Sequence, residues 1–185
     1  MKKLLACLAT VLISIGAMAE TRPFNLSLTP DVAVYSRSDT IEGLTLSIWG
    51  ENQQSSLALG IANGSVGRSA GVNLGILNYA DNYAGFQWGL VNYTKHDSSG
   101  WQGGFLLGLI VSGVNYTGDT MRGLYTGVVN YSGKLSGLEL GLVNYTNDAD
   151  GIQIGLINIV GQNKSWFGEM PNALAPWMIL VNWRF

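Results

Sequence analysis

A nine-residue motif decides the fold, and its clearest run is Gly123-Leu-Tyr-Thr-Gly-Val-Val-Asn-Tyr131, Gly137-Leu-Glu-Leu-Gly-Leu-Val-Asn-Tyr145 and Gly151-Ile-Gln-Ile-Gly-Leu-Ile-Asn-Ile159. Two more clear copies begin at Gly71 and Gly85. Within each run, the first glycines of adjacent copies lie 14 residues apart, and such a fixed period is typical of repeat architectures. Degenerate copies begin at residues 43, 56 and 100.

Side chains alternate with a period of two within a copy, which predicts a β-strand. In the copy 137–145, the even positions carry leucine up to Leu142 and then Asn144. The odd positions carry glycine and Glu139 before they reach Tyr145. Short polar segments with the composition of turns separate the copies. Strands of this length joined by short turns predict an up-and-down antiparallel sheet.

A β-solenoid is the alternative, because stacking the same residue of every coil into a ladder would explain the recurring asparagine directly. A straight nine-residue strand advances about 30 Å, whereas five turn residues span at most about 18 Å. The solenoid therefore requires a sharp bend at the second glycine of each motif, as at Gly141. The antiparallel meander requires no bend, so the sequence favours the meander and leaves the solenoid open.

Composition restricts the class of protein. The chain has 185 residues with 25 Gly, 47% hydrophobic residues and only 12% charged residues. Such apolar content excludes a charge-rich disordered chain, and ten basic against twelve acidic residues exclude a basic nucleic-acid binder. The length fits one domain. A charge-poor, glycine-rich chain of this size is either a membrane protein or a tightly wound β protein.

Residues 1–19 are predicted to be a secretory signal peptide, with an apolar stretch from Leu4 to Ile15 and a small-x-small cleavage site at Ala17-Met-Ala19. That stretch is shorter than the roughly 20 residues of a spanning helix. The only cysteine, Cys7, lies inside it, so the mature chain is expected to form no disulfide. Residues 20–185 are predicted to form a single β-repeat domain.

A sheet with one continuous apolar face must bury that face in a second layer or in lipid. No later segment has the pattern of a covering helix, so the sequence predicts a transmembrane β-barrel of about ten strands with the lipid bilayer as its partner. Spanning strands need about 9–11 residues with alternating apolarity, and the motif length fits. The tyrosines that close the copies, such as Tyr93 and Tyr145, are placed where an interfacial girdle would lie.

The last strand adds to this interpretation. Counting back from Phe185, every second residue is large and apolar as far as Trp177. This alternation resembles the C-terminal recognition strand of bacterial outer-membrane barrels. The resemblance implies that the outer-membrane assembly machinery reads this strand and that the protein is located in the cell outer membrane.

The repeat resembles the surface-repeat proteins of spirochaetes, which are built from Gly-x-x-x-Gly-Leu-x-Asn units. The resemblance covers roughly residues 43–159. It implies an envelope or cell-surface location and no known activity.

The sequence predicts no catalytic, cofactor-binding or metal-binding residues. His96, Asp97 and Ser98 are consecutive in a turn, where a nucleophile, base and orienting acid cannot easily align. The segment 147–151 has a faint likeness to a calcium loop but lacks the glutamate at the twelfth position. Glu139 and Arg122 are expected to face a barrel lumen, where they either set ion preference or fill and solvate the interior.

Two interpretations of the repeated asparagines stay open: a turn-capping role, or, in a solenoid, an exposed row that contacts a ligand. The Asn-Tyr-Thr triplets at Asn92, Asn115 and Asn144 also match a glycosylation pattern, and the repeat itself explains them.

The predicted function is a non-enzymatic outer-membrane β-barrel or surface-repeat protein that acts as a narrow pore or an envelope structural component. The alternative is a secreted or periplasmic β-solenoid that acts as a binding module. A membrane-embedded hydrolase or acyltransferase is disfavoured by the single histidine.

Overall fold

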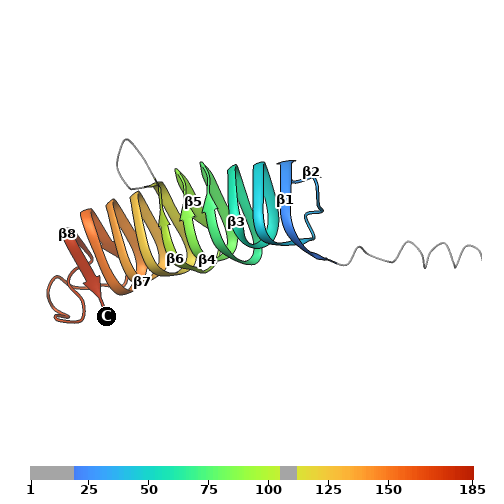
Figure 1. Cartoon of the computed structure of the whole chain (residues 1–185). Coiled ribbons are helices and arrows are strands. Elements are labelled where there is room, and N and C mark those ends of the chain that lie inside the picture. Colours follow the sequence, from blue (N-terminus) through green and yellow to red (C-terminus); the bar gives the residue numbers. More distant parts are fainter. Residues whose placement is uncertain (1–18, 105–111) are drawn as a thin grey trace, which may run out of the picture.

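The computed structural model describes residues 19–104 and 112–185, so nearly all of the predicted signal peptide lies outside the described residues. The described elements are all β-strands (Figure 1), which confirms the all-β prediction. None of the described residues forms a helix long and apolar enough to cross a membrane. The strands are β1 (Thr21–Thr29), β2 (Val32–Ala33), β3 (Thr40–Leu74), β4 (Leu77–Trp88), β5 (Val91–Thr94), β6 (Ser98–Gly103), β7 (Ser112–Val160) and β8 (Trp177–Arg184).

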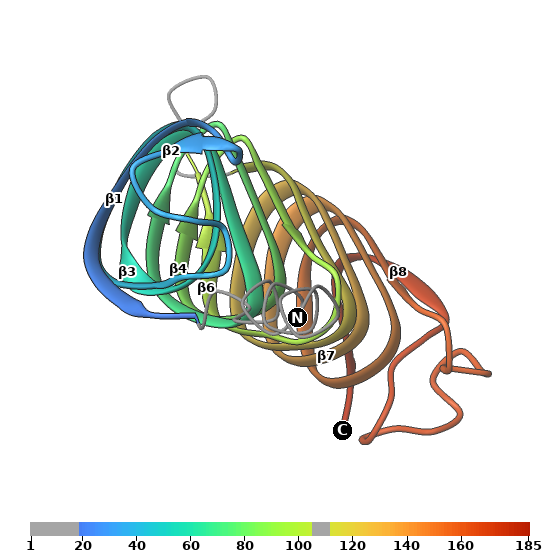
Figure 2. The ribbon, with the colours of Figure 1, turned by 90° about the vertical axis from the view of Figure 1, so that its right-hand side faces the viewer.

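Neighbouring motif copies pair in parallel and in register. Gly71 lies opposite Gly85, Asn78 opposite Asn92, and Asn92 opposite Asn115. The predicted up-and-down antiparallel arrangement is therefore wrong for the described repeats, and the pairing between coils is that of the β-solenoid left open above. Figure 1 shows the coils stacked along one axis, and Figure 2 looks nearly along that axis.

The error in the antiparallel prediction lies in treating each copy as one straight strand. The chain bends at the second glycine of the motif, and at Gly75 and Gly89 the bend interrupts the strand. The bend also changes which side chains point inward. In one coil the buried positions change from odd, at Glu139, to even, at Asn144. Leu142 therefore lies outside the coil and Asn144 inside it, although the two share parity.

The first glycine of the motif permits close stacking of the coils. Gly137 has a backbone φ of 145°, a conformation that residues other than glycine rarely adopt. A Cβ at Gly137 would overlap the carbonyl oxygen of Gly123, one coil earlier. The same overlap would occur between Gly123 and Gly100. These glycines form a column in which the backbones of neighbouring coils are too close to admit a side chain.

The interior is lined by a ladder of amides from the eighth motif position. Each side-chain amide donates to the side-chain oxygen of the equivalent asparagine one coil further on, at 2.7–3.0 Å. Several also donate to a backbone carbonyl, such as that of Ile154. Buried polar groups cost little when every donor finds an acceptor. The ladder consists of Asn63, Asn78, Asn92, Asn115, Asn130, Asn144 and Asn158, none more than 1% exposed.

A second interior row comes from the third motif position and is also mostly polar. Gln102 donates to the side-chain oxygen of Gln87 at 2.6 Å, and Gln153 donates to Glu139 at 2.8 Å. The apolar part of the core is small. Its buried cluster comprises Met121, Tyr125, Leu135, Ala149 and Val160.

The C-terminal end of the stack is closed by a strand of opposite direction. β8 pairs antiparallel with the last coil of β7. Asn182 of β8 is fully buried and donates to the backbone carbonyl of Asn158 at 3.2 Å, where the asparagine ladder ends. An antiparallel cap of this kind covers an edge that would otherwise template further pairing.

Candidate functional site

Polarity is inverted in this protein compared with most globular domains. Its buried side chains are largely amides and hydroxyls, whereas many large hydrophobic side chains are exposed. Exposed apolar patches of unusual size mark interaction or membrane surfaces. The outer surface of the coil is therefore the candidate functional site.

The apolar side chains follow two sides of the coil. The sixth and seventh motif positions form what we call the aliphatic face, where Leu142 is 51% and Leu156 is 59% exposed. The second and fourth positions form the adjoining face, which carries Phe86, Trp88 and Trp101. Exposed members of the aliphatic face are Ile48, Ile61, Ile76, Leu77, Leu90, Val114, Val129, Leu142, Leu156 and Ile157.

The third side consists of the segments between the copies, and we call it the polar edge. These segments were predicted to be turns, but most of them continue β4 and β7. Between residues 71 and 160, Glu139 is the only charged side chain outside these segments in the described part of the chain. Neighbouring coils are linked there by ion pairs, such as Lys134 with Asp148 at 3.2 Å. The polar edge comprises residues 81–84, 95–99, 118–122, 133–136 and 147–150.

A column of stacked tyrosines separates the aliphatic face from the polar edge. Tyr93, Tyr116, Tyr131 and Tyr145 stack with ring centroids 4.8–5.2 Å apart and planes within 8° of parallel. We call it the tyrosine ladder. It arises because the ninth motif position points outward and the coils are in register. In the structure the ladder lies between the aliphatic face and the charged segments, and the interfacial girdle predicted for these tyrosines stays a prediction.

An aromatic cluster lies on the adjoining face. Phe86 stacks on Trp88 with centroids 5.4 Å apart, and Trp101 meets both rings edge-on at 5.0 and 5.5 Å. The indole nitrogen of Trp101 donates to the hydroxyl of Thr126 at 3.0 Å. The cluster is a rigid apolar patch two residues from the polar edge along the same strands.

His96, Asp97 and Ser98 do not come together. His96 contacts Asp119 of the next coil at 3.0 Å, and Asp97 accepts a hydrogen bond from the backbone nitrogen of Thr120. Ser98 points inward and accepts from Gln102. These contacts hold turns together and align no nucleophile with a base.

The prediction that Glu139 and Arg122 face a common interior is wrong. Glu139 is fully buried inside the coil, whereas the Arg122 side chain is 57% exposed on the polar edge. Glu139 accepts from Ser132 and Gln153, each at 2.8 Å. Burial raises the pKa of Glu139 from 4.5 to about 7, and these two hydrogen bonds oppose that rise.

The other sequence motifs also have structural roles. Asp148, in the calcium-like segment, pairs with Lys134 and with Arg184. The described residues contain no group of three metal-ligating side chains. Asn92, Asn115 and Asn144 are fully buried, so the asparagines form neither an exposed ligand-contacting row nor accessible acceptors for a glycan.

Comparison with protein-family models, curated proteins and solved structures found no match to this chain.

Proposed function

We propose that this chain is a non-enzymatic envelope protein that lies in the surface of a lipid bilayer. The axis of the solenoid lies parallel to the membrane, the aliphatic face enters the hydrocarbon and the polar edge faces water. The observation that carries the proposal is the column of exposed aliphatic side chains, which includes Leu90, Leu142 and Leu156.

The solenoid can accept lipid on its sides because its backbone groups are already paired. Backbone hydrogen bonds join each coil to the next, as from Val91 to Ile76 at 3.0 Å. An unpaired backbone group in hydrocarbon costs several kcal/mol, and the in-register stack avoids that cost along its length. The transfer of each exposed leucine side chain from water into hydrocarbon is favourable by about 1.5–3 kcal/mol when the side chain is fully buried.

The tyrosine ladder supports this orientation. Tyrosine is favoured at the level of the lipid headgroups, where its ring is apolar and its hydroxyl remains hydrated. The four stacked tyrosines from Tyr93 to Tyr145 form a row. This row lies between the face proposed to enter lipid and the charged polar edge.

The proposed location is the outer membrane, with the lipid bilayer as partner and export through the segment 1–19. The outer-membrane assembly machinery is a further proposed partner, through the C-terminal strand that ends in Phe185. The side chain of Phe185 is 64% exposed, so it is accessible to such a partner.

Flotation with phosphatidylcholine vesicles tests the lipid proposal. The wild-type chain should float, and the double variant Leu142→Asp/Leu156→Asp should lose at least tenfold of its vesicle-bound fraction. The matched control Ser136→Asp/Asn147→Asp adds the same charge to the polar edge and should float like wild type. Circular dichroism checks that all three retain strand structure.

Two outcomes would overturn the proposal. A wild-type chain that stays soluble without detergent and does not float would instead support the secreted or periplasmic solenoid that binds a soluble partner. A chain that is heat-modifiable in detergent gels and conducts in planar bilayers would support the narrow transmembrane pore.

A further inference from the structure

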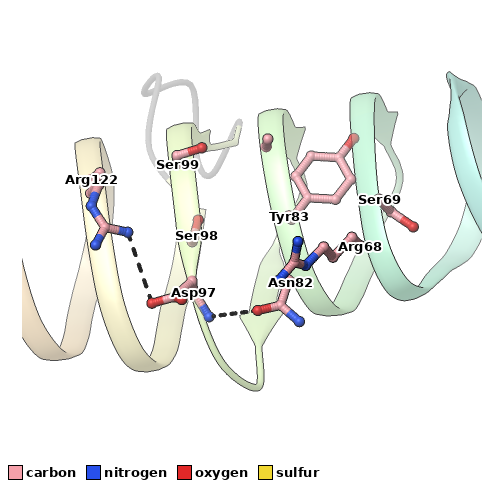
Figure 3. Close-up of a pocket in the computed structure, with 9 residues that line it drawn as sticks. Arg68, Ser69, Asn82, Tyr83, Asp97, Ser98, Ser99 and Arg122 are labelled. Atoms are coloured by element: carbon pink, nitrogen blue, oxygen red, sulfur yellow. Dashed lines mark hydrogen bonds and ion pairs between the residues drawn. The ribbon is translucent and has the colours of Figure 1, made fainter.

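A hollow opens on the polar edge where four coils meet, with a volume of about 270 Å³. Figure 3 shows Arg68 on one side and Arg122 on the other, with Asp97 between them. The parallel register brings these residues together, because Arg68 lies opposite Asn82. Ser99 lies opposite both Ala84 and Arg122. The small side chains of Ala84 and Ser99 leave the space open.

The hollow contains both signs of charge. Arg68 is exposed and forms no ion pair within the described residues. Asp97 lies 3.9 Å from Arg122, and both side chains are more than half exposed. An exposed pair at this separation contributes little stability. Arg122 and the backbone nitrogen of Thr120 both contact Oδ1 of Asp97, so within the described residues Oδ2 is available to a ligand.

The aromatic cluster follows the hollow along β4 and β6, although its rings do not line the hollow. Ala84 and Phe86 are two residues apart on β4, and Ser99 and Trp101 are two residues apart on β6. Ala84 and Phe86 both lie on the outside of the coil, whereas Tyr83 and Gln87 are buried. A molecule whose polar end occupies the hollow can therefore lay an apolar part across Phe86 and Trp101.

We propose that this hollow binds a zwitterionic lipid headgroup that carries a phosphate and an ammonium group. The phosphate contacts Arg68 and the hydroxyl of Ser99, the ammonium contacts Asp97, and an acyl chain lies over the aromatic cluster. Arg122 already pairs with Oδ1 of Asp97. A simple anion would therefore leave Oδ2 of Asp97 without a partner, and a simple cation would leave Arg68 without one. The charges of the hollow therefore match a zwitterion better than either. Only the assignment of the ligand to a lipid rests on the proposed membrane role.

Calorimetric titration of the full chain with soluble headgroups tests the charge assignment. O-phosphoethanolamine should bind at least tenfold more tightly than glycerol 3-phosphate, which lacks the ammonium group, or ethanolamine, which lacks the phosphate. Arg68→Gln should weaken phosphoethanolamine binding at least tenfold. Asp97→Asn should reduce phosphoethanolamine affinity to that of glycerol 3-phosphate. Lys134→Gln, on the same edge but outside the hollow, should change nothing.

Several results would overturn this inference. These are the absence of saturable binding by phosphoethanolamine, equal affinity for phosphoethanolamine and glycerol 3-phosphate, or wild-type affinity in both hollow variants. Because this titration contains no bilayer, it gives an answer even if the chain fails to float with vesicles.

A second titration tests the lipid source. Dihexanoyl phosphatidylethanolamine, kept below its micelle concentration, should bind more tightly than phosphoethanolamine, and Trp101→Ala should remove that advantage. Equal affinity of the two ligands for the wild type would overturn the lipid source. Arg68→Gln should still float with phosphatidylcholine vesicles, because the aliphatic face anchors the chain. Loss of headgroup binding is thereby distinguishable from loss of membrane binding.

Discussion

Asn130 donates its side-chain amide to the side-chain oxygen of Asn144 at 2.7 Å, one coil further along the stack. The same amide nitrogen also donates to the backbone carbonyl of Leu140 at 3.0 Å. Asn130 thus joins two coils through its side chain and also pairs a backbone carbonyl, as Asn63, Asn92 and Asn144 do. The ladder specifies parallel, in-register stacking because a shift of one residue would break all of its bonds at once.

Replacing Asn144 with alanine should lower the free energy of unfolding by about 3 kcal/mol, since it leaves several buried polar groups without partners. Asn158 loses its donor, and so does the carbonyl of Ile154. Asn147→Ala, at an exposed turn position, should change stability by no more than about 0.5 kcal/mol. Denaturant unfolding followed by circular dichroism measures both. Equal midpoints for the two variants would contradict a structural role for the ladder.

Glu139 should make stability depend on pH. Its pKa is about 7 in the folded protein against an ordinary value of 4.5, because burial disfavours the charged form. The folded state therefore holds the proton more tightly than the unfolded state. The contribution of this proton to the free energy of unfolding is complete below pH 4.5. It is lost as the pH rises towards 7 and above.

Glu139→Gln should remove this pH dependence and should raise stability at pH 8 by up to about 3 kcal/mol. Glutamine at 139 can pair with Gln153 as Gln102 pairs with Gln87. Glu42→Gln, at an exposed position, is the control and should retain the wild-type pH profile. Thermal unfolding between pH 4 and pH 9 is the measurement. An unchanged slope in Glu139→Gln would show that another group causes the dependence.

Gly137→Ala should prevent the coils from stacking. The substitution forces alanine into a φ of 145° and drives its Cβ into the carbonyl oxygen of Gly123. Strain of this kind costs at least about 2 kcal/mol. Ser136→Ala, at the preceding position, should fold normally. The measurement is the yield of refolded strand structure by circular dichroism together with the melting temperature. A wild-type melting temperature in Gly137→Ala would exclude this close approach.

The repeat period and the strand content could be predicted from the sequence because both are local properties. The direction of strand pairing could not be predicted, because the alternation of side chains was assumed to continue through Gly141 without a bend. With the bend, Asn144 points inward and Leu142 outward. An amide at the end of an apolar strand face gives the same sequence pattern as an amide inside a coil. Only the recurrence of that amide at every copy indicated the ladder.

The candidate surface was partly predictable for a similar reason. The tyrosines occupy a motif position, so their alignment in one row could be inferred from the repeat, whereas their placement at a membrane interface stays a prediction. The hollow could not be predicted, because Arg68, Asp97 and Arg122 lie in the segments between copies, outside the motif. Their meeting depends on the register between coils, including the longer segment between β6 and β7. The 23-residue offset that sets Ser99 opposite Arg122 is not visible in the motif spacing.

Tyr131 stacks between Tyr116 and Tyr145, so its removal interrupts the tyrosine ladder at an internal position. Tyr131→Ala should lose about 1–3 kcal/mol of stability, since each aromatic pair contributes roughly 0.5–1.5 kcal/mol. It should also weaken vesicle binding, because one interfacial ring is lost. Tyr131→Phe keeps the stack and removes only the hydroxyl, so it should retain stability and bind vesicles more weakly than wild type. Thermal unfolding without lipid and flotation with vesicles separate the two effects. If Tyr131→Phe and wild type partition equally into vesicles, the hydroxyl row does not lie at the headgroup level and the proposed orientation is wrong.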